Sequence, residues 1–275
     1  MKSKKLLLLL SLLGIGLLIA CTAPPVPTPE PTIEVPPEPT NTLAPPTATP
    51  VSGDPCSVAG QQEKIESAFS AFQAESDPLI ELNRWTNELT AEIAAECQAD
   101  DFQLTDPAEL KALLEKLYEG GYVIYVRHTH TDRSRGDTDV TLGSCDTQRI
   151  LSERGRDEAF MIRNAYDQLE LPISQIISTQ YCRTLETAIL AFDVPFVVSR
   201  VELTENLPNV LADEPEPGTN TIVVAHIGTL RQWRDLDDTF EEGDSFIYKP
   251  AGDGDYEFIG RIGLYDWPVM ASLKQ

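Results

Sequence analysis

Short apolar runs alternate with helical segments through the second half of this 275-residue chain. Each run has the length of a strand and is rich in Val, Ile and aromatic residues, a pattern typical of buried strands. The runs lie at residues 122–126, 175–179, 195–199 and 221–226, and the helical segments at 151–170, 182–192 and 228–236. Strands that alternate with helices form parallel sheets, so the pattern predicts an α/β fold: a three-layer αβα sandwich with a largely parallel sheet.

This α/β domain is expected to span residues 105–275. Its first helix is marked by Thr105 as a candidate cap, by Pro107 near the first turn and by two glycines at its exit. At the other end, residues 244–250 and 256–264 flank a Gly-Asp-Gly turn. This arrangement is typical of a β-hairpin.

The amino terminus has the features of an export signal. Three lysines are followed by an apolar run over residues 6–20 that is shorter than a membrane-spanning helix needs. The sequence LIAC, which ends at Cys21, resembles the lipobox of bacterial lipoproteins. We therefore predict a signal peptide over residues 1–20, lipidation of Cys21, and an extracytoplasmic protein that the lipid anchors to the bacterial membrane.

A Pro/Thr-rich stretch separates this signal from the first helical segments. Residues 22–50 contain 11 of the 21 prolines and show no apolar periodicity. Such a composition favours extended polyproline conformations, so residues 21–54 are expected to form a semi-rigid linker. Residues 55–104 carry apolar residues at helical spacing on both sides of a break at Asp77 and Pro78. They are predicted to form an α-helical hairpin.

Four cysteines remain when Cys21 is lipidated. In an exported protein an even number favours disulfides, and four cysteines permit three pairings. Chain proximity favours Cys56 with Cys97, at the two ends of the helical hairpin. It also favours Cys145 with Cys182, between two loops of the later domain. Zinc binding is the alternative, although the sequence has no CxxC pair and no close Cys/His pair.

The charge of the chain limits its partners. The formal net charge is −23, which repels nucleic acid and anionic membranes, so nucleic-acid partners are excluded. Residues 127–163 differ from the rest because they hold seven arginines and seven acids. Local arginines in this segment could attract a phosphate that the overall field repels.

Polar side chains follow three of the predicted strands. Arg127 and His128 come directly after the first strand, Arg183 follows the second, and His226 ends the last. Ligands of parallel sheets bind beyond the carboxyl ends of the strands, so these four side chains are expected to meet in one crevice. Guanidinium groups bind phosphoryl oxygens in bidentate fashion, and a neutral imidazole nitrogen can attack phosphorus. The sequence thus predicts a phosphomonoester site that needs no metal and no other cofactor.

Three motifs make this prediction more specific. VRHTHTD, STQYCRTLETA and VVAHIGTL occur in this order at the strand ends. Together they resemble the histidine phosphatase superfamily, also called the phosphoglycerate mutase-like fold, and the closing segments are similar to a bacterial branch of secreted or envelope phosphatases. The resemblance implies that His128 is the nucleophile and becomes a phosphohistidine. It also implies that the rest of the phosphate pocket is formed by Arg127, Arg183 and His226.

The resemblance further points to a proton donor for the leaving alcohol. The family often carries this acid in an LxE segment after the third strand, which places Glu205 first, with Asp132 and Asp244 as competing candidates. Thr131, Asp132 and Arg149 are expected to contact the substrate, although a surface salt bridge explains Arg149 equally well.

Two other interpretations stay open on the sequence alone. HTHTD matches the start of an HxHxDH metal motif, but Arg133 stands where the final histidine would be, and two nearby arginines would oppose a divalent cation. A catalytically inactive envelope lipoprotein that binds a phosphate or phosphosugar through the same arginines is the alternative function. We predict instead a membrane-anchored, metal-independent phosphoric monoester hydrolase of the histidine acid phosphatase type, acting on a small phosphorylated substrate. A mutase is less favoured in an exported protein.

Overall fold

The computed structural model describes residues 54–75, 79–97, 103–234 and 240–274. The predicted signal peptide, the lipidation site at Cys21 and nearly all of the predicted linker lie outside these residues. Among the described residues, no helix combines the length and the apolar character that crossing a membrane requires.

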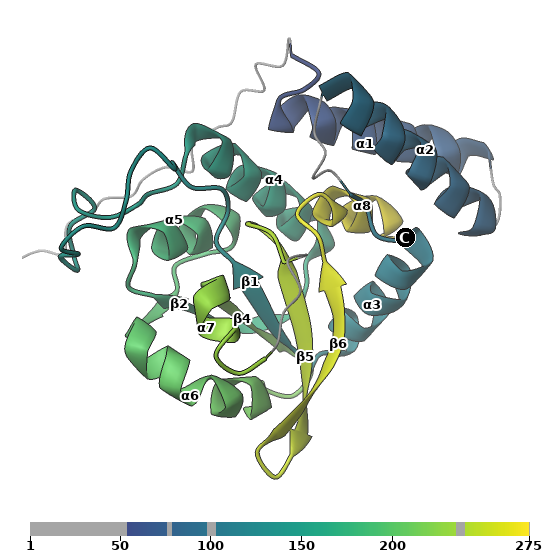
Figure 1. Cartoon of the computed structure of the whole chain (residues 1–275). Coiled ribbons are helices and arrows are strands. Elements are labelled where there is room, and N and C mark those ends of the chain that lie inside the picture. The colour runs from purple at the N-terminus through teal and green to yellow at the C-terminus, as the bar shows by residue number, and fades with distance from the viewer. Residues whose placement is uncertain (1–53, 76–78, 98–102, 235–239, 275) are drawn as a thin grey trace, which may run out of the picture. The chain divides into compact units, whose positions relative to one another are not determined.

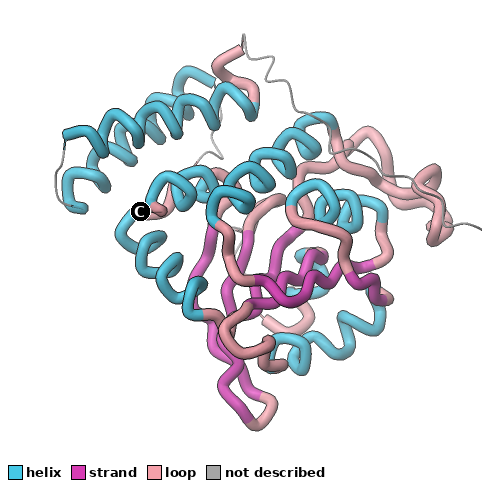
Figure 2. Tube along the Cα trace, turned by 180° about the vertical axis from the view of Figure 1, so that it is seen from behind, coloured by secondary structure: helices cyan, strands magenta, loops and turns pink. Residues whose placement is uncertain are grey.

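One mixed sheet lies at the centre of the α/β domain (Figures 1 and 2). Its strands run in the order β3-β2-β4-β1-β5-β6, with β3, β2, β4 and β1 parallel and with β5 and β6 as an antiparallel edge. The predicted α/β sandwich with a largely parallel sheet is thus confirmed, as is the closing hairpin. The strands are β1 (Val123–Arg127), β2 (Ile173–Thr179), β3 (Phe196–Val198), β4 (Asn220–Ala225), β5 (Ser245–Gly252) and β6 (Asp255–Ile262).

Helices cover both faces of this sheet. Helices α3, α4, α5 and α8 bury their apolar side chains in one cluster, and α6 packs in a second cluster on the opposite face. The two clusters with the sheet between them give the three layers. The helices are α1 (Val58–Glu75), α2 (Leu79–Cys97), α3 (Pro107–Glu119), α4 (Glu153–Leu169), α5 (Cys182–Ala191), α6 (Arg200–Ala212), α7 (Ile227–Leu230) and α8 (Asp266–Leu273).

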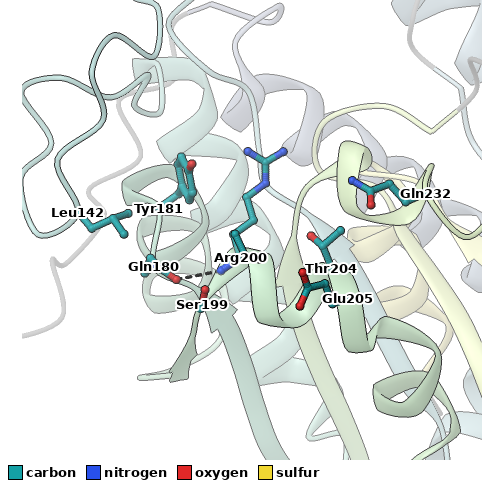
Figure 3. Close-up of a pocket in the computed structure, with 9 residues that line it drawn as sticks. Leu142, Gln180, Tyr181, Ser199, Arg200, Thr204, Glu205 and Gln232 are labelled. Atoms are coloured by element: carbon teal, nitrogen blue, oxygen red, sulfur yellow. Dashed lines mark hydrogen bonds between the residues drawn. The ribbon is translucent and has the colours of Figure 1, made fainter.

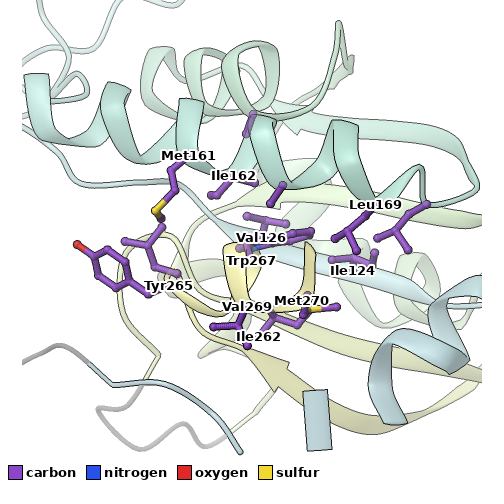
Figure 4. Packing of buried hydrophobic residues seen from close by; sticks show 14 of the residues in the cluster. Ile124, Val126, Met161, Ile162, Leu169, Ile262, Tyr265, Trp267, Val269 and Met270 are labelled. Atoms are coloured by element: carbon purple, nitrogen blue, oxygen red, sulfur yellow. The ribbon is translucent and has the colours of Figure 1, made fainter. Parts of the chain in front are cut away.

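Strand β1 is buried on both faces because its residues alternate between the two clusters. Ile124 and Val126 pack with α4 and α8, where Figure 4 shows them close to Trp267, whereas Val123 and Tyr125 belong to the cluster beneath α6. These four strand residues and Trp267 have no exposed surface. Each buried side chain of this size contributes roughly 1.5–3 kcal/mol. This packing fixes the carboxyl end of β1, and with it the residues that follow.

Helices α1 and α2 form the predicted helical hairpin. A disulfide joins Cys56 to Cys97, as predicted from their positions at the hairpin ends. Ile65 of α1 and Ile93 of α2 have no exposed surface and belong to the apolar cluster that α4 and α8 also line. The hairpin therefore packs through apolar side chains against the face of the α/β domain that α4 and α8 cover.

Two helices were not predicted from the sequence, and one is shorter than expected. In α8, Trp267, Val269 and Met270 are all buried, so no polar face produces a helical pattern in the sequence. Helix α6 contains Pro208, which normally interrupts a helix. The helix predicted at 228–236 ends as an α-helix at Leu230.

The cap of α3 also differs from the prediction. Asp106, not Thr105, caps this helix, since its carboxylate accepts a hydrogen bond from the backbone N–H of Ala108 at 2.8 Å. Thr105 instead donates through its backbone N–H and its hydroxyl to the carboxylate of Asp266, at 2.8 and 2.6 Å. Asp266 is fully buried. A buried carboxylate needs such donors, and this need outweighs the local capping preference.

Candidate active site

The carboxyl ends of β1 and β4 bring two histidines together. These strands are parallel neighbours with Arg127 opposite Ala225, so the residues that follow them, His128 and His226, lie side by side. The centroids of the two imidazole rings are 5.5 Å apart. The backbone N–H of His128 also donates to the carbonyl oxygen of Ala225 at 3.2 Å. Both side chains are buried, with 3% and 4% of their surface exposed.

The hydrogen bonding of His128 fixes its tautomer. Its Nδ1 lies 3.0 Å from the carbonyl oxygen of Thr129. A carbonyl oxygen can only accept, so Nδ1 carries the proton and Nε2 keeps its lone pair. Burial lowers the pKa of His128 to about 3, and the nearby Arg183 and Arg127 act in the same direction. The ring is therefore neutral at ordinary pH, as a nitrogen nucleophile must be.

This depressed pKa predicts how the stability of the protein depends on pH. Below the ordinary histidine pKa of about 6.5, the unfolded chain binds a proton at His128 that the folded chain does not bind, so the free energy of unfolding falls as the pH falls. Relative to wild type, His128→Asn should gain about 1.4 kcal/mol of stability per pH unit below about 6.5. Urea unfolding of both proteins between about pH 7 and 5 measures this gain, and parallel stability curves would contradict it.

His226 is held by polar contacts on both its ring and its backbone. The ring Nε2 lies 3.0 Å from the hydroxyl of Thr179 at the end of β2, and the hydroxyl of Tyr125 donates to the backbone carbonyl of His226 at 2.8 Å. Burial holds the pKa of His226 well below its usual value, and neighbouring charges, including Arg183 and Arg200, add to the effect. This histidine is thus also neutral, and the guanidinium groups of Arg183 and Arg200 make its surroundings positive.

Two arginines are fixed beside the histidines by acceptors from distant parts of the chain. Arg127 donates through Nη1 to the backbone carbonyl of Phe240, and its Nη2 lies 3.7 Å from the carboxylate of Glu242. Arg183, on the first turn of α5, grips both carboxylate oxygens of Asp137 at 3.1 and 3.2 Å. Only 3% of its surface is exposed. These pairs leave neither guanidinium free to rotate.

Each of three arginines in this region has one donor that remains buried without a partner among the described residues. The donors are the Nε–H groups of Arg127, Arg149 and Arg183. A buried donor that lacks an acceptor costs about 1–3 kcal/mol, so such groups are rarely left unpaired in folded proteins. Unpaired N–H groups of guanidinium ions are suited to an oxyanion, which accepts several hydrogen bonds and neutralises the charge.

A cavity of about 340 Å³ lies beside His226 on the side of α6, and Figure 3 shows the residues that line it. Tyr181 forms the connection: its ring meets the His226 ring edge-on at 5.1 Å, and the guanidinium groups of Arg183 and Arg200 lie 4.9 and 5.3 Å from its centroid. Glu205 and Gln232 are among the other residues that line the cavity. It therefore offers space for a group attached to an anion held at the arginines.

The structure places the remaining predicted site residues in different surroundings. Glu205 is exposed and lines the cavity beside Arg200. Asp132 is also near the surface, and its carboxylate accepts hydrogen bonds from the backbone N–H and the hydroxyl of Ser134 at 2.9 and 2.6 Å. Thr131 is buried, and its hydroxyl donates to Glu242 at 3.0 Å, so this hydroxyl is engaged within the protein.

Asp244, the third candidate for the proton donor, is occupied by structural contacts. Its carboxylate accepts hydrogen bonds from Arg261 at 2.6 Å and from the backbone N–H groups of Glu241 and Leu264 at 2.8 and 3.1 Å. Burial raises its pKa to about 6, although the contacts with Arg261 oppose this rise. The carboxylate thus ties β5 to β6 and the start of α8.

A disulfide holds the loop after β1 against the start of α5. Cys145 of this loop is bonded to Cys182, as predicted, and Cys182 directly precedes Arg183. The side chain of Gln148 adds a second link, since its Oε1 accepts from the backbone N–H of Cys182 at 3.0 Å. The same loop carries Asp137 and Arg149. The disulfide therefore keeps the acceptor of Arg183 in place.

His130, the second histidine of the HTHTD motif, belongs to a separate pair. Its Nδ1 lies 2.7 Å from the carboxylate of Glu158, which is fully buried in α4 and also accepts from Arg154 at 2.8 Å. Within the part of the chain that the structure describes, no three His, Cys, Asp or Glu side chains gather as metal ligands do.

Sequence reasoning missed three residues that the structure brings to the site. Asp137 and Glu242 lie in loops with no periodic pattern, so nothing in the sequence marks them. Arg200 was detectable, because it follows β3 in the same way that Arg127 ends β1. The rule that ligands gather at the carboxyl ends of parallel strands, applied to every strand, includes it.

Comparison with known proteins gives matches among solved structures alone. No family model matches the chain, and no curated protein matches it. A structure of the protein histidine phosphatase SixA complexed with tungstate is 14% identical, with 52% of this chain and 97% of that chain covered and a TM-score of 0.39. A mycobacterial glucosyl-3-phosphoglycerate phosphatase is 15% identical, with 50% and 97% covered and a TM-score of 0.36. These solved neighbours are histidine phosphatase superfamily members.

Proposed function

We propose that this protein hydrolyses a phosphomonoester through a phosphohistidine formed at His128. One observation carries the proposal: His128 keeps the lone pair on Nε2, and the two arginines whose charges act on its ring, Arg127 and Arg183, each hold a buried Nε–H without an acceptor among the described residues. Tetrahedral phosphate supplies the missing acceptors, and the arginines would neutralise the charge on its equatorial oxygens during transfer.

The charges around the two histidines support a dianionic ligand. Four guanidinium groups act on these rings or lie beside them, and two carboxylates pair with members of this set. With all six groups ionised, two positive charges remain, and these would balance the two negative charges of a phosphomonoester above its second pKa of about 6. The cations are Arg127, Arg149, Arg183 and Arg200, and the anions are Asp137 and Glu242.

The proposed reaction has two steps, phosphorylation of His128 and hydrolysis of the phosphohistidine. Nε2 of His128 attacks phosphorus, the bond from phosphorus to the ester oxygen breaks, and an acid gives the leaving alkoxide a proton. Water then attacks the phosphohistidine, the carboxylate that lost its proton in the first step takes one from this water, and His128 leaves with its lone pair restored as inorganic phosphate departs. We assign the acid to Glu205, because it lines the cavity that the leaving group would enter.

We also propose that the protein is exported and held to the bacterial membrane by a lipid on Cys21. The lipobox-like LIAC sequence and the proline-rich stretch that follows it support this location. The pairs Cys56–Cys97 and Cys145–Cys182 are consistent with it, since disulfides persist in oxidising compartments. Labelling cells with a radioactive fatty acid tests the anchor, because Cys21→Ser should abolish incorporation.

The proposed activity is tested with the full chain purified in detergent. We expect turnover of p-nitrophenyl phosphate that a chelator leaves unchanged, and an acid-labile phosphate attached to the protein during turnover. A protein that binds orthophosphate without any turnover would instead be a binding lipoprotein. Turnover that the chelator abolishes would contradict the mechanism, since no step of it uses a metal.

A further inference from the structure

Glu242 is a buried carboxylate that the proposed mechanism leaves unused. It lies in the segment before β5, and only 2% of its surface is exposed. One oxygen, Oε1, accepts from the hydroxyl of Thr131 at 3.0 Å and lies 3.7 Å from Nη2 of Arg127 and 4.0 Å from Nδ1 of His128. The other oxygen lies 3.7 Å from Nη2 of Arg133. Glu242 thus connects the nucleophile to the surrounding arginines.

This carboxylate is ionised in spite of its burial. Although burial alone would raise it, the pKa of Glu242 is lowered, and in the free state, where His128 is neutral, the Arg127 charge and the Thr131 hydroxyl contribute to this lowering. A negative charge therefore stands on the Nδ1 side of the His128 ring. The phosphoryl group would bind on the opposite side, at Nε2.

Phosphorylation changes the charge of that ring. Before the reaction the ring is neutral, with its proton on Nδ1 and donated to Thr129. When Nε2 bonds to phosphorus, both ring nitrogens carry a substituent and the ring becomes an imidazolium. Hydrolysis of the phosphohistidine removes this positive charge again. A fixed negative charge near Nδ1 therefore favours the phosphorylated state over the free state.

We propose that Glu242 is a positioning residue that stabilises the positive charge of the phosphorylated His128 ring. This inference rests on the proposed function, and it makes Glu242 act in opposite directions on the two chemical steps. Its charge accelerates phosphorylation of His128, where positive charge develops. It does not accelerate dephosphorylation, where that charge disappears. A residue that only maintained the fold would affect both steps in the same direction.

Rapid-quench kinetics with the full chain distinguish these outcomes. In Glu242→Gln the rate constant for phosphorylation of His128 should fall about tenfold or more, which corresponds to about 1.4 kcal/mol in the barrier, while dephosphorylation is unchanged or faster. Glu242→Asp keeps the charge but draws it back from the ring, so phosphorylation should fall by a smaller factor. Equal slowing of both steps, or unchanged phosphorylation, would overturn the proposal.

Further measurements separate the role of Glu242 from damage to the pocket, from misfolding and from failure of the proposed function. Inhibition by orthophosphate reports on the intact pocket, and it should not weaken in Glu242→Gln, because removal of an anion leaves the pocket more positive. If Glu242→Gln fails to fold, Glu242→Asp carries the test by the same criterion of unequal effects on the two steps. A wild-type protein that forms no phosphohistidine would refute the proposed function itself, before the role of Glu242 is in question.

Discussion

Replacement of His128 by alanine is expected to reduce hydrolysis of p-nitrophenyl phosphate by about 10⁴-fold or more, since loss of a nucleophile removes the covalent pathway. The effect should appear in kcat and not only in KM, because the arginines that we propose bind the phosphoryl group remain in place. The phosphate attached to the protein during turnover should disappear as well. Circular dichroism and urea unfolding check that the variant is folded.

His130 is the matched control for this experiment. It lies two residues along the same loop, but its ring is paired with Glu158 on α4. His130→Ala leaves that carboxylate with Arg154, which already donates to it at 2.8 Å. We therefore expect activity within about tenfold of wild type. If His130→Ala abolished turnover while His128→Ala retained it, the nucleophile would be assigned to the wrong histidine.

Much of this site could be predicted from the sequence because parallel strands fix the edge of the sheet at which the residues that follow them lie. The run VIYVR is buried on both faces of β1, and TIVVA is likewise buried in β4. Parallel pairing of two such strands brings their carboxyl ends to one edge, whatever the connecting segments do. His128 and His226, almost 100 residues apart, therefore meet without any local signal between them.

The partners of these residues could not be predicted in the same way. Asp137 and Glu242 reach the site from irregular loops, where no period relates one residue to the next. Thr131 illustrates the consequence: it was predicted to contact the substrate, whereas its hydroxyl is bonded to Glu242. A buried carboxylate requires donors, and a nearby hydroxyl meets that requirement in the structure.

Arg183→Lys is expected to lower kcat/KM for p-nitrophenyl phosphate by about 10²- to 10³-fold, the range typical for loss of one donor that stabilises a transition state. Lysine keeps the positive charge but not the planar fork, which binds Asp137 through two nitrogens while a third, Nε, stays buried and unpaired. The loss therefore measures geometry and not charge.

Arg156→Lys provides the control for Arg183→Lys, because Arg156 also pairs with an acid close by, Glu186 of α5, at 2.6 Å, but is 40% exposed. A surface pair of this kind contributes about 0–1 kcal/mol, so this variant should keep its activity within about threefold. The contrast follows from burial: the Nε–H of Arg183 is buried without an acceptor among the described residues, and a bound phosphoryl oxygen would supply one, whereas solvent completes the hydrogen bonds of Arg156. Equal effects of the two substitutions would mean that Arg183 binds Asp137 alone, and the phosphoryl group would then lie elsewhere along the carboxyl edge of the sheet.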